Sequence, residues 1–593
     1  MRFPGLVALL VAVFAWAPHA AAAANHPNVL LIITDDQGFG DVASHGNPHI
    51  HTPVHDQLAA SGVRFDRFYV SPVCAPTRAS LLTGRYDLRT GVFGVTRGYE
   101  TMSADEVTLA EALKAGGYRT GAFGKWHNGR HMPNHPNGQG FDEFFGFCGG
   151  HWNRYFDANL EHNGEPVETK GYIIDTLTDE AMKFIQTNHG KQPWFCYVPY
   201  NTPHSPWRVP DEYWKKYADK DLDDMARCAY AMVENIDSNM GRLLGLLDKL
   251  KATDNTIVIF MTDNGANSDR FNAGMKGRKG SVDEGGVRVP LFIRYPGVIK
   301  PETKISEIAA HIDLFPTLLE LCGVPRPRTA PLDGVSLVPL LNRTAKNWPD
   351  RMIFTDRFTD RSTRENLKGA VRTQRWRAVL SRTKWSLYDM PSDPGQKNNV
   401  AAENPEIVKR FATAYDKWLE GTGAWKLDYH PIPVGHPAGR AVEAPANEAM
   451  QHPAQGKGIN YKGSPAGFAN TWIREWTDTE SYPHWKLDVL NDGRYAVEIK
   501  YTLSAENVGT RVAVEIGAQR VEARLDYAFD LPLVHKPNHV LPADGYEEKA
   551  AWKWAHLGEV TLNKGATEMK VRALDIPGKG TIDLKSVRLT RVQ

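Results

Sequence analysis

Residues 28–36 read Asn-Val-Leu-Leu-Ile-Ile-Thr-Asp-Asp, an apolar run that stops abruptly at two carboxylates. Three further runs share this design and end in polar residues: 118–124, 194–199 and 256–262. Continuous apolar runs of this length are typical of strands that are buried on both faces of a parallel sheet. The four runs therefore predict the central strands of one sheet.

Helical patterns separate these runs, with apolar residues three and four positions apart in 108–115, 174–187 and 225–251. Strands that alternate with helices predict an α/β fold, in which a large, mostly parallel sheet is flanked by helices. Ligands bind such sheets beyond the carboxyl ends of the strands. The polar residues that end the four runs are therefore expected to converge on one site.

The pattern changes after residue 341. Short strands are expected at 376–380 and 385–388, followed by a helix that Asn404 caps and that ends before Gly421. This stretch predicts a small α+β subdomain.

Residues 422–465 are rich in Pro, Gly, Ala and His without a clear period, which indicates an extended linker. Strict alternation in 495–501 and 512–516, and again near the C-terminus, predicts an all-β sandwich. Its Trp472, Trp552 and Trp554 favour either carbohydrate binding or a structural lid. The predicted boundaries are 25–341 for the α/β domain, 342–421 for the subdomain, 422–465 for the linker and 466–593 for the sandwich.

The N-terminus has the features of a secretory signal peptide. Met1-Arg2 precedes an apolar run over 5–17, and small residues close the segment at 20–24. Residues 1–24 therefore predict export to the periplasm or the extracellular space. No later apolar run is long enough for a membrane anchor. With 70 Lys+Arg against 69 Asp+Glu, the chain does not have the excess of basic residues that is typical of nucleic-acid-binding proteins.

The chain has five cysteines, of which Cys74 lies in the most informative motif. The other four permit two disulfides in three connectivities, and buried free thiols are at least as consistent with the sequence. These four are Cys148, Cys196, Cys228 and Cys322.

Two predicted strand ends carry oxygen ligands. Asp35 and Asp36 are adjacent carboxylates, which repel each other unless a cation lies between them or a pKa is raised. Asp263 and Asn264 supply another carboxylate and a carbonyl oxygen. An all-oxygen set of this kind suits Ca²⁺ or Mg²⁺ rather than Zn²⁺.

Cys74 begins the sequence Cys-Ala-Pro-Thr-Arg, which reads as the start of a helix. A nucleophile at a helix N-terminus faces free backbone N–H groups and the positive end of the dipole, an arrangement suited to an anion. Arg78 lies one turn further on, where its guanidinium can contact oxygens of the site.

Four more candidates have side chains suited to anion binding or proton transfer: Lys125, His127, His204 and Lys279. The first three follow predicted strands. Lys279 opens a glycine-rich segment, and the sequence does not decide whether it, Lys276 or Arg278 points inward.

Six motifs together resemble, in order, those of the type I, formylglycine-dependent sulfatases of the alkaline phosphatase superfamily. The resemblance covers about residues 27–435. Its motifs are Thr34-Asp35-Asp36-Gln37-Gly38, Cys74-Ala75-Pro76-Thr77-Arg78, Gly124-Lys125-Trp126-His127, Pro203-His204, Thr262-Asp263-Asn264-Gly265 and Glu284-Gly285-Gly286-Val287-Arg288.

This resemblance implies that a formylglycine-generating enzyme converts Cys74 to 3-oxoalanine, whose hydrate attacks the sulfur of a sulfate ester. It also implies one Ca²⁺ held by Asp35, Asp36, Asp263, Asn264 and the modified Cys74. Arg78 and His127 would support the hydrated aldehyde, Lys125 and Lys279 would hold the sulfate, and His204 would protonate the leaving group. Asn128 departs from the family pattern, where Leu is usual, and His151 or Asn153 could contact the substrate.

The expected function is therefore that of an exported sulfatase, with sulfated carbohydrate as its expected substrate class. One alternative is a phosphonate or phosphate ester hydrolase of the same superfamily. Another is a non-catalytic glycan-binding protein.

Overall fold

The computed structural model describes most of the chain, in the ranges 26–359, 361–439, 441–454, 456–461, 471–534, 539–540 and 549–592. The predicted signal peptide lies outside these residues. Within them, no helix has the length and apolar character needed to cross a membrane. All five cysteines are buried free thiols.

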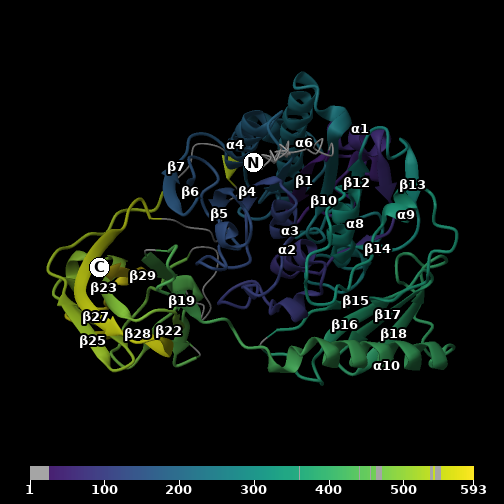
Figure 1. The fold of residues 1–593 in the computed structure, drawn as a ribbon. Helices are drawn as coiled ribbons and strands as arrows, with labels where there is room; N and C mark the ends of the chain where they lie inside the picture. Colours follow the sequence, from purple (N-terminus) through teal and green to yellow (C-terminus); the bar gives the residue numbers. More distant parts are fainter. Residues whose placement is uncertain are drawn as a thin grey trace, which may run out of the picture.

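A ten-stranded mixed sheet forms the centre of the larger lobe (Figure 1). The four predicted strands are its neighbouring parallel strands, in the order β10-β1-β8-β4, so the α/β prediction is confirmed. Across the sheet the strands are β13 (Thr303–Ile305), β2 (Val63–Phe65), β12 (Leu291–Arg294), β10 (Thr256–Thr262), β1 (Asn28–Thr34), β8 (Trp194–Pro199), β4 (Arg119–Lys125), β5 (Glu143–Phe147), β6 (Asn159–His162) and β7 (Glu165–Glu168).

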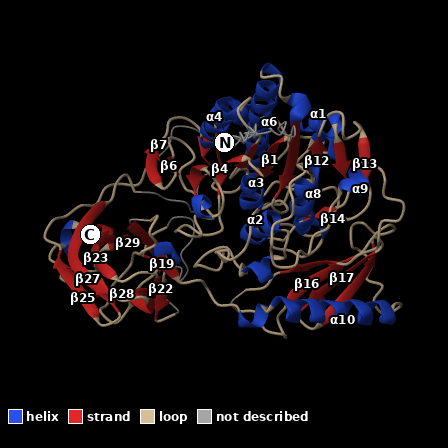
Figure 2. Cartoon of the chain, viewed as in Figure 1, coloured by secondary structure: helices blue, strands red, loops and turns tan. Residues whose placement is uncertain are grey.

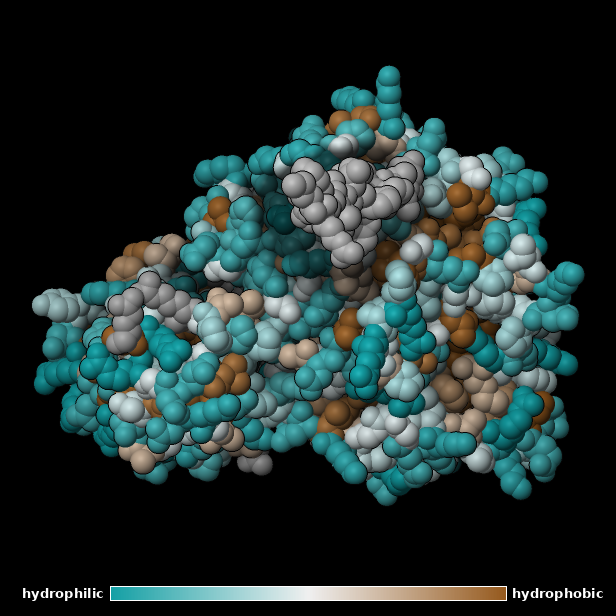
Figure 3. All heavy atoms as spheres, viewed as in Figure 1, coloured by the Kyte–Doolittle hydropathy of each residue, from teal (hydrophilic) through white to brown (hydrophobic). Residues whose placement is uncertain are grey.

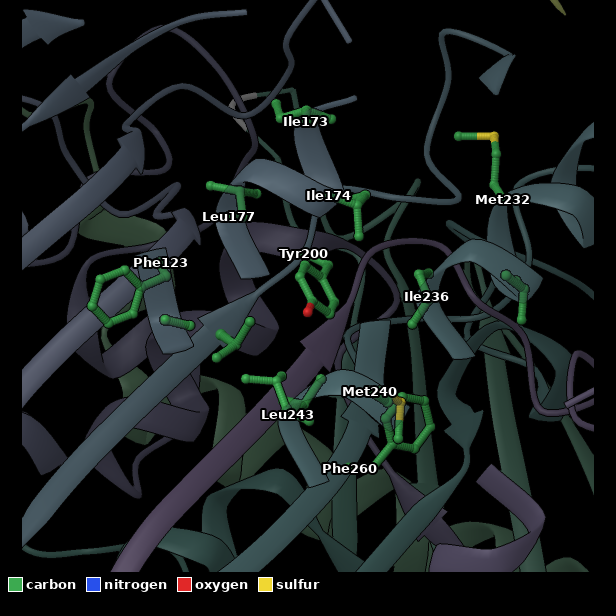
Figure 4. Packing of buried hydrophobic residues seen from close by; sticks show 14 of the residues in the cluster. Phe123, Ile173, Ile174, Leu177, Tyr200, Met232, Ile236, Met240, Leu243 and Phe260 are labelled. Atoms are coloured by element: carbon green, nitrogen blue, oxygen red, sulfur yellow. The ribbon is translucent and has the colours of Figure 1, made fainter. Parts of the chain in front are cut away.

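Helices cover both faces of this sheet, which explains why β1 is apolar throughout. Leu30 and Ile32 pack with helices α1, α4 and α6, whereas Leu31 and Ile33 pack with α2, α3 and α8. Figure 4 shows part of the first cluster, with Ile174 and Leu177 from α4 and Ile236 and Leu243 from α6. Every residue of β1 is buried as a result. The helices are α1 (Pro53–Ser61), α2 (Cys74–Thr83), α3 (Leu109–Ala115), α4 (Ile173–Asn188), α6 (Asp224–Lys249) and α8 (Leu314–Leu321).

A four-stranded antiparallel sheet follows, and helix α10 packs against it (Figure 2). Asn404 precedes this helix but makes no side-chain cap, and the helix continues through Gly421 to end at Gly423, whose φ of 75° favours glycine. The elements are β15 (Ile353–Asp356), β16 (Lys368–Arg372), β17 (Trp376–Ser381), β18 (Lys384–Asp389) and α10 (Pro405–Thr422).

The C-terminal lobe is a sandwich of two sheets whose strands pair mostly antiparallel, as predicted (Figure 1). The surface that this lobe presents in the space-filling view, on the left, is mostly hydrophilic (Figure 3). One sheet joins β19 (Ile432–Val434), β22 (Tyr482–Val489), β28 (Gly565–Asp575), β24 (Arg511–Ile516) and β25 (Gln519–Arg524), with β21 (Met450–His452) beside β22. The other joins β20 (Ala441–Pro445), β29 (Asp583–Val592), β23 (Gly493–Thr502) and β27 (Lys553–Leu562).

The expected linker differs from the structure, because part of it belongs to the sandwich. Strands β19, β20 and β21 lie within 422–465 and pair with β22 and β29. Val434, Val442 and Ala444 are buried in the sandwich core. Strands of three to five residues, two of which contain proline, are too short to show a period, so the composition of the segment indicates a surface linker.

Short elements complete the described fold. Strand β26, from the β-domain, pairs with β9 of the larger lobe, so the two lobes share a backbone ladder. These elements are β3 (Phe68–Tyr69), β9 (Arg208–Val209), α5 (Asp211–Lys215), α7 (Glu284–Val287), β11 (Arg288–Val289), β14 (Ala309–Ala310), α9 (Val338–Leu341) and β26 (His539–Val540).

Buried His311 predicts acid sensitivity of the fold. Burial lowers its pKa to about 3, so between pH 3 and 6.5 the unfolded chain binds a proton that the folded chain does not, and stability falls as the pH is lowered. We expect this residue to reduce the free energy of unfolding by about 2 kcal/mol between pH 7 and 5. Urea unfolding of wild type and His311→Gln at both pH values tests this. The free energy of unfolding of wild type minus that of the variant should be about 2 kcal/mol smaller at pH 5 than at pH 7. The same value at both pH values would contradict the prediction.

Candidate active site

The ends of β1 and β10 bring the oxygen ligands together. Thr34 and Thr262 are aligned in the parallel ladder, so Asp35-Asp36 and Asp263-Asn264 leave the sheet side by side. The Asp36 backbone N–H donates to Asp263 Oδ1 at 3.1 Å, and the Asn264 amide donates to Asp36 Oδ1 at 2.8 Å. All four side chains are buried.

Cys74 is the first residue of α2, whose N-terminus points into this cluster. Thr77, in the same turn, donates its hydroxyl to the Asp263 carbonyl at 2.7 Å and so anchors the helix to the end of β10. Burial, together with the charge of Asp35, raises the pKa of the Cys74 thiol to about 12. The unmodified side chain is therefore a protonated thiol at neutral pH.

Three cations pair with the three carboxylates. Arg78 donates to Asp263 Oδ2 at 2.8 and 3.2 Å. Lys125 Nζ lies 2.5 Å from Asp35 Oδ2, and Lys279 Nζ lies 2.5 Å from an oxygen of Asp36.

Lys279 is the inward-pointing cation of the glycine-rich segment. Its Nζ also lies 3.5 Å from Cys74 Sγ. Lys276 contacts the Tyr388 hydroxyl instead, and Arg278 donates to the Asn267 carbonyl. The structure thus separates three candidates that the sequence left open.

Three imidazoles line the same site. His204 Nε2 lies 3.5 Å from Asp36 Oδ2, and its ring centre is 4.7 Å from that of His151. His127 contacts the Val95 carbonyl through Nε2 at 2.9 Å. Burial lowers the pKa of His204 to about 3 and the pKa values of His127 and His151 well below their usual value, so all three rings are neutral.

The oxygens of the cluster fit a hard cation. Asp35 Oδ1, Asp36 Oδ2 and Asn264 Oδ1 are buried and have no hydrogen-bond partner among the described residues. Buried polar atoms without partners are costly and rare. Asp35, Asp36, Cys74 and His204 each offer a ligand atom within 4.8 Å of the others. A divalent cation with oxygen ligands would satisfy the three oxygens.

One neighbouring side chain, Arg357, was not recognised as a candidate from the motifs. It follows β15 and is half-buried. Burial lowers its pKa, and the Asp356 carboxylate and the thiolate form of Cys74 oppose this lowering. Arg357 therefore lies within electrostatic range of Cys74, although it comes from the α+β subdomain.

Asn128, noted in the sequence as a departure from the family pattern, donates to the carbonyls of Ala75 and Glu100 at 3.1 and 3.3 Å. Its amide therefore holds the first turn of α2.

A family model described as Sulfatase matches residues 27–324, and one described as N-sulphoglucosamine sulphohydrolase, C-terminal, matches residues 278–417. This chain belongs to the sulfatase family. The resemblance seen in the motifs is thereby confirmed, and the protein is a sulfuric ester hydrolase.

Relatives of known name agree with this membership. Human arylsulfatase A is 31% identical over 458 residues, covering 65% of this chain and 87% of its own. Mouse N-acetylgalactosamine-6-sulfatase is 34% identical over 372 residues, covering 56% and 69%. The crystal structure of Ps i-CgsB in complex with k-i-k-neocarrahexaose is 31% identical, with a TM-score of 0.63, and covers 68% of this sulfatase and 94% of that chain.

Proposed function

We propose that this sulfatase is exported and hydrolyses sulfate monoesters of carbohydrate, after a formylglycine-generating enzyme has converted Cys74 to 3-oxoalanine. The position of Cys74 carries this proposal. Its Sγ lies beside Lys279 at the N-terminus of α2, yet its thiol pKa of about 12 leaves almost no thiolate for attack. The hydrate of an aldehyde at this position would supply a hydroxyl for attack on sulfur and a second hydroxyl for release of sulfate.

Asp35, Asp36, Asp263 and Asn264, with the modified Cys74, would hold one Ca²⁺. Bound there, the ion would polarise a sulfate oxygen. When all three carboxyl groups are ionised, as ligands of a divalent cation are, they balance the three cations of this buried cluster in charge. A divalent ion would therefore leave an excess of two positive charges, which favours entry of an anionic ester.

The remaining side chains have separate tasks in this proposal. Arg78 fixes Asp263 and, through the Lys125 carbonyl at 3.1 Å, the end of β4. Lys125 and Lys279 place ammonium groups where sulfate oxygens would bind. His127 would support the hydrated residue 74.

His204 is the proposed acid for the leaving alcohol. The Nδ1–H group of His204 donates to the Ser205 carbonyl, so a proton on Nε2 is available only in the imidazolium form. The S–O bond to the alcohol breaks as the alcohol oxygen takes that proton from Nε2. An anionic ester beside the ring would raise the pKa of His204, because negative charge stabilises the imidazolium form.

Carbohydrate is the favoured substrate class. The predicted signal peptide places the enzyme outside the cytoplasm, where sulfated polysaccharides occur, and the chain resembles N-acetylgalactosamine-6-sulfatases and a structure bound to a neocarrahexaose. The phosphonate monoester hydrolase of Agrobacterium radiobacter shares the fold, at 23% identity and a TM-score of 0.53. A phosphonate or phosphate ester hydrolase is therefore the alternative that a rate comparison must exclude.

The test begins with mass spectrometry of the peptide that contains Cys74, from protein made with a formylglycine-generating enzyme. That protein is then assayed on 4-nitrophenyl sulfate, a phosphodiester and a panel of sulfated glycans. We expect kcat/KM for sulfate to exceed that for the phosphodiester by at least about 100-fold, because the second ester group of a phosphodiester would replace one of the three free oxygens that a sulfate monoester offers to the buried ammonium groups. The opposite preference would favour the alternative, and no turnover of either would favour a glycan-binding protein.

A further inference from the structure

A cleft of about 1200 Å³ lies between the catalytic lobe and the β-domain. One wall comes from β5 to β7 and the segment after β5, and includes Trp152. The other wall is the outer face of the four-stranded sheet of the β-domain, and includes Trp552 and Arg588. The matches to the two family models end at residues 324 and 417, so the second wall lies outside the part of the chain that they cover.

Segment 148–154 separates this cleft from the active site. On the inner side, a Cβ on Gly150 would lie 2.1 Å from His127 Nε2, and the His151 ring packs against that of His204. On the outer side, Cys148 and Trp152 line the cleft. A ligand that extends from the active site over this segment would enter the cleft at once.

The cleft presents aromatic surfaces from both walls. Trp152 stacks on Phe147 at 4.8 Å, and its indole Nε1 has no hydrogen-bond partner among the described residues. Arg588 lies 3.9 Å from the centre of the Trp554 ring, and the ammonium groups of Lys585 and Lys549 lie 5.6 and 5.9 Å from the centre of the Trp552 ring. Of the tryptophans among the described residues, Trp152 and Trp552 line the cleft.

The charges that line the cleft are nearly balanced, with five Lys or Arg and six Asp or Glu side chains. On the β-domain wall, Arg588 pairs with Glu498 at 2.7 Å and Lys500 lies 3.9 Å from Glu443. A balanced lining does not select a polyanion. It supplies hydrogen-bond donors and acceptors for hydroxyl groups, and indole rings pack against the apolar faces of sugars.

We propose that this cleft binds the hydroxyl-bearing units of an oligosaccharide whose sulfated unit occupies the active site, with Trp152 and Trp552 as its stacking surfaces. This proposal rests on the proposed function and extends it, because it makes the enzyme selective for chains over single sugars. It also gives the β-domain a binding role rather than that of a lid.

The test compares Trp552→Ala with wild type on two substrates from the same polymer, a hexasaccharide and a sulfated monosaccharide. We expect KM for the hexasaccharide to rise about 5- to 10-fold, as for the loss of one aromatic contact, with kcat within 2-fold. The ratio of the two KM values therefore rises by the same factor. An unchanged ratio would overturn the proposal.

Tyr482→Ala provides the matched control. Tyr482, like Trp552, is a half-buried aromatic residue with basic groups over its ring, Arg572 at 4.5 Å and Lys570 at 5.5 Å, but it belongs to the other sheet of the sandwich. Its removal is expected to leave the KM ratio unchanged. If both variants change the ratio equally, the effect is one of domain stability and the cleft proposal fails.

Binding separates this proposal from the catalytic one. Full-length Cys74→Ala protein is titrated calorimetrically with carrageenan, heparin and chondroitin sulfate hexasaccharides and their desulfated forms. At least one pair should bind in both forms, and Cys74→Ala/Trp552→Ala should bind it about 5- to 10-fold more weakly. Binding without turnover by the wild type would refute only the sulfatase proposal for glycans, whereas absence of binding to every hexasaccharide would overturn the cleft proposal.

Discussion

Cys74→Ala is expected to abolish sulfate ester hydrolysis, with a loss of at least about 10⁴-fold in kcat/KM, as for removal of a catalytic nucleophile. Alanine cannot form the aldehyde, and no other cysteine offers a ligand atom to the cluster of Asp35, Asp36 and His204. The measurement is the initial rate on 4-nitrophenyl sulfate, with protein coexpressed with the formylglycine-generating enzyme. Cys74→Ser should be equally impaired and accumulate a sulfated serine, visible as an added mass.

Cys196→Ala is the control for this experiment. Cys196 is a buried free thiol in β8 and lies away from the cluster, so its removal leaves a small cavity and costs stability rather than chemistry. It should retain wild-type kcat. A Cys74→Ala enzyme with wild-type activity would refute the proposed mechanism, whatever the control shows.

Asp36→Asn is expected to lower kcat/KM by about 10³-fold, equivalent to about 4 kcal/mol of transition-state stabilisation. The change removes one charged ligand from the proposed Ca²⁺ site and leaves Lys279 without its carboxylate at 2.5 Å. A second readout does not depend on turnover. Ca²⁺ at 100 times its Kd should stabilise the wild type by about 2.7 kcal/mol, seen as a rise in Tm, and should leave the Tm of the variant unchanged.

Asp237→Asn controls for the loss of a buried carboxylate. Asp237 pairs with His55 at 2.6 Å, both side chains are buried, and neither lies in the cluster. This variant should be less stable than wild type but should keep the full Tm shift with Ca²⁺. If Asp36→Asn also keeps the shift, the cation is bound elsewhere.

The sequence predicted the parts of the structure that have strong local patterns. The central residues of strands β1, β4, β8 and β10 are apolar because helices cover both faces of the sheet, and this pattern is visible in the sequence itself. The convergence of their polar ends follows from parallel pairing. Hence the sequence predicts that Asp35 and Asp263, which are 228 positions apart, lie close together, because each follows one of these parallel strands.

Other features depend on contacts that leave no local signature. Lys276, Arg278 and Lys279 are equivalent in sequence, and only the path of the loop turns Lys279 toward Cys74. Arg357 reaches the site from a different subdomain. Strands β19 to β21 are too short for periodicity and are stabilised by the strands they join.

The burial of α2 has a consequence for how the enzyme must be produced. Each residue of the helix is buried, and Cys74 is only 1% exposed. The formylglycine-generating enzyme cannot reach that thiol once the sulfatase chain has folded, so the proposed oxidation of Cys74 must precede folding. Protein that folds with its thiol intact would then be permanently inactive. The yield of active enzyme would depend on the rate of Cys74 modification relative to the rate of folding during synthesis and export.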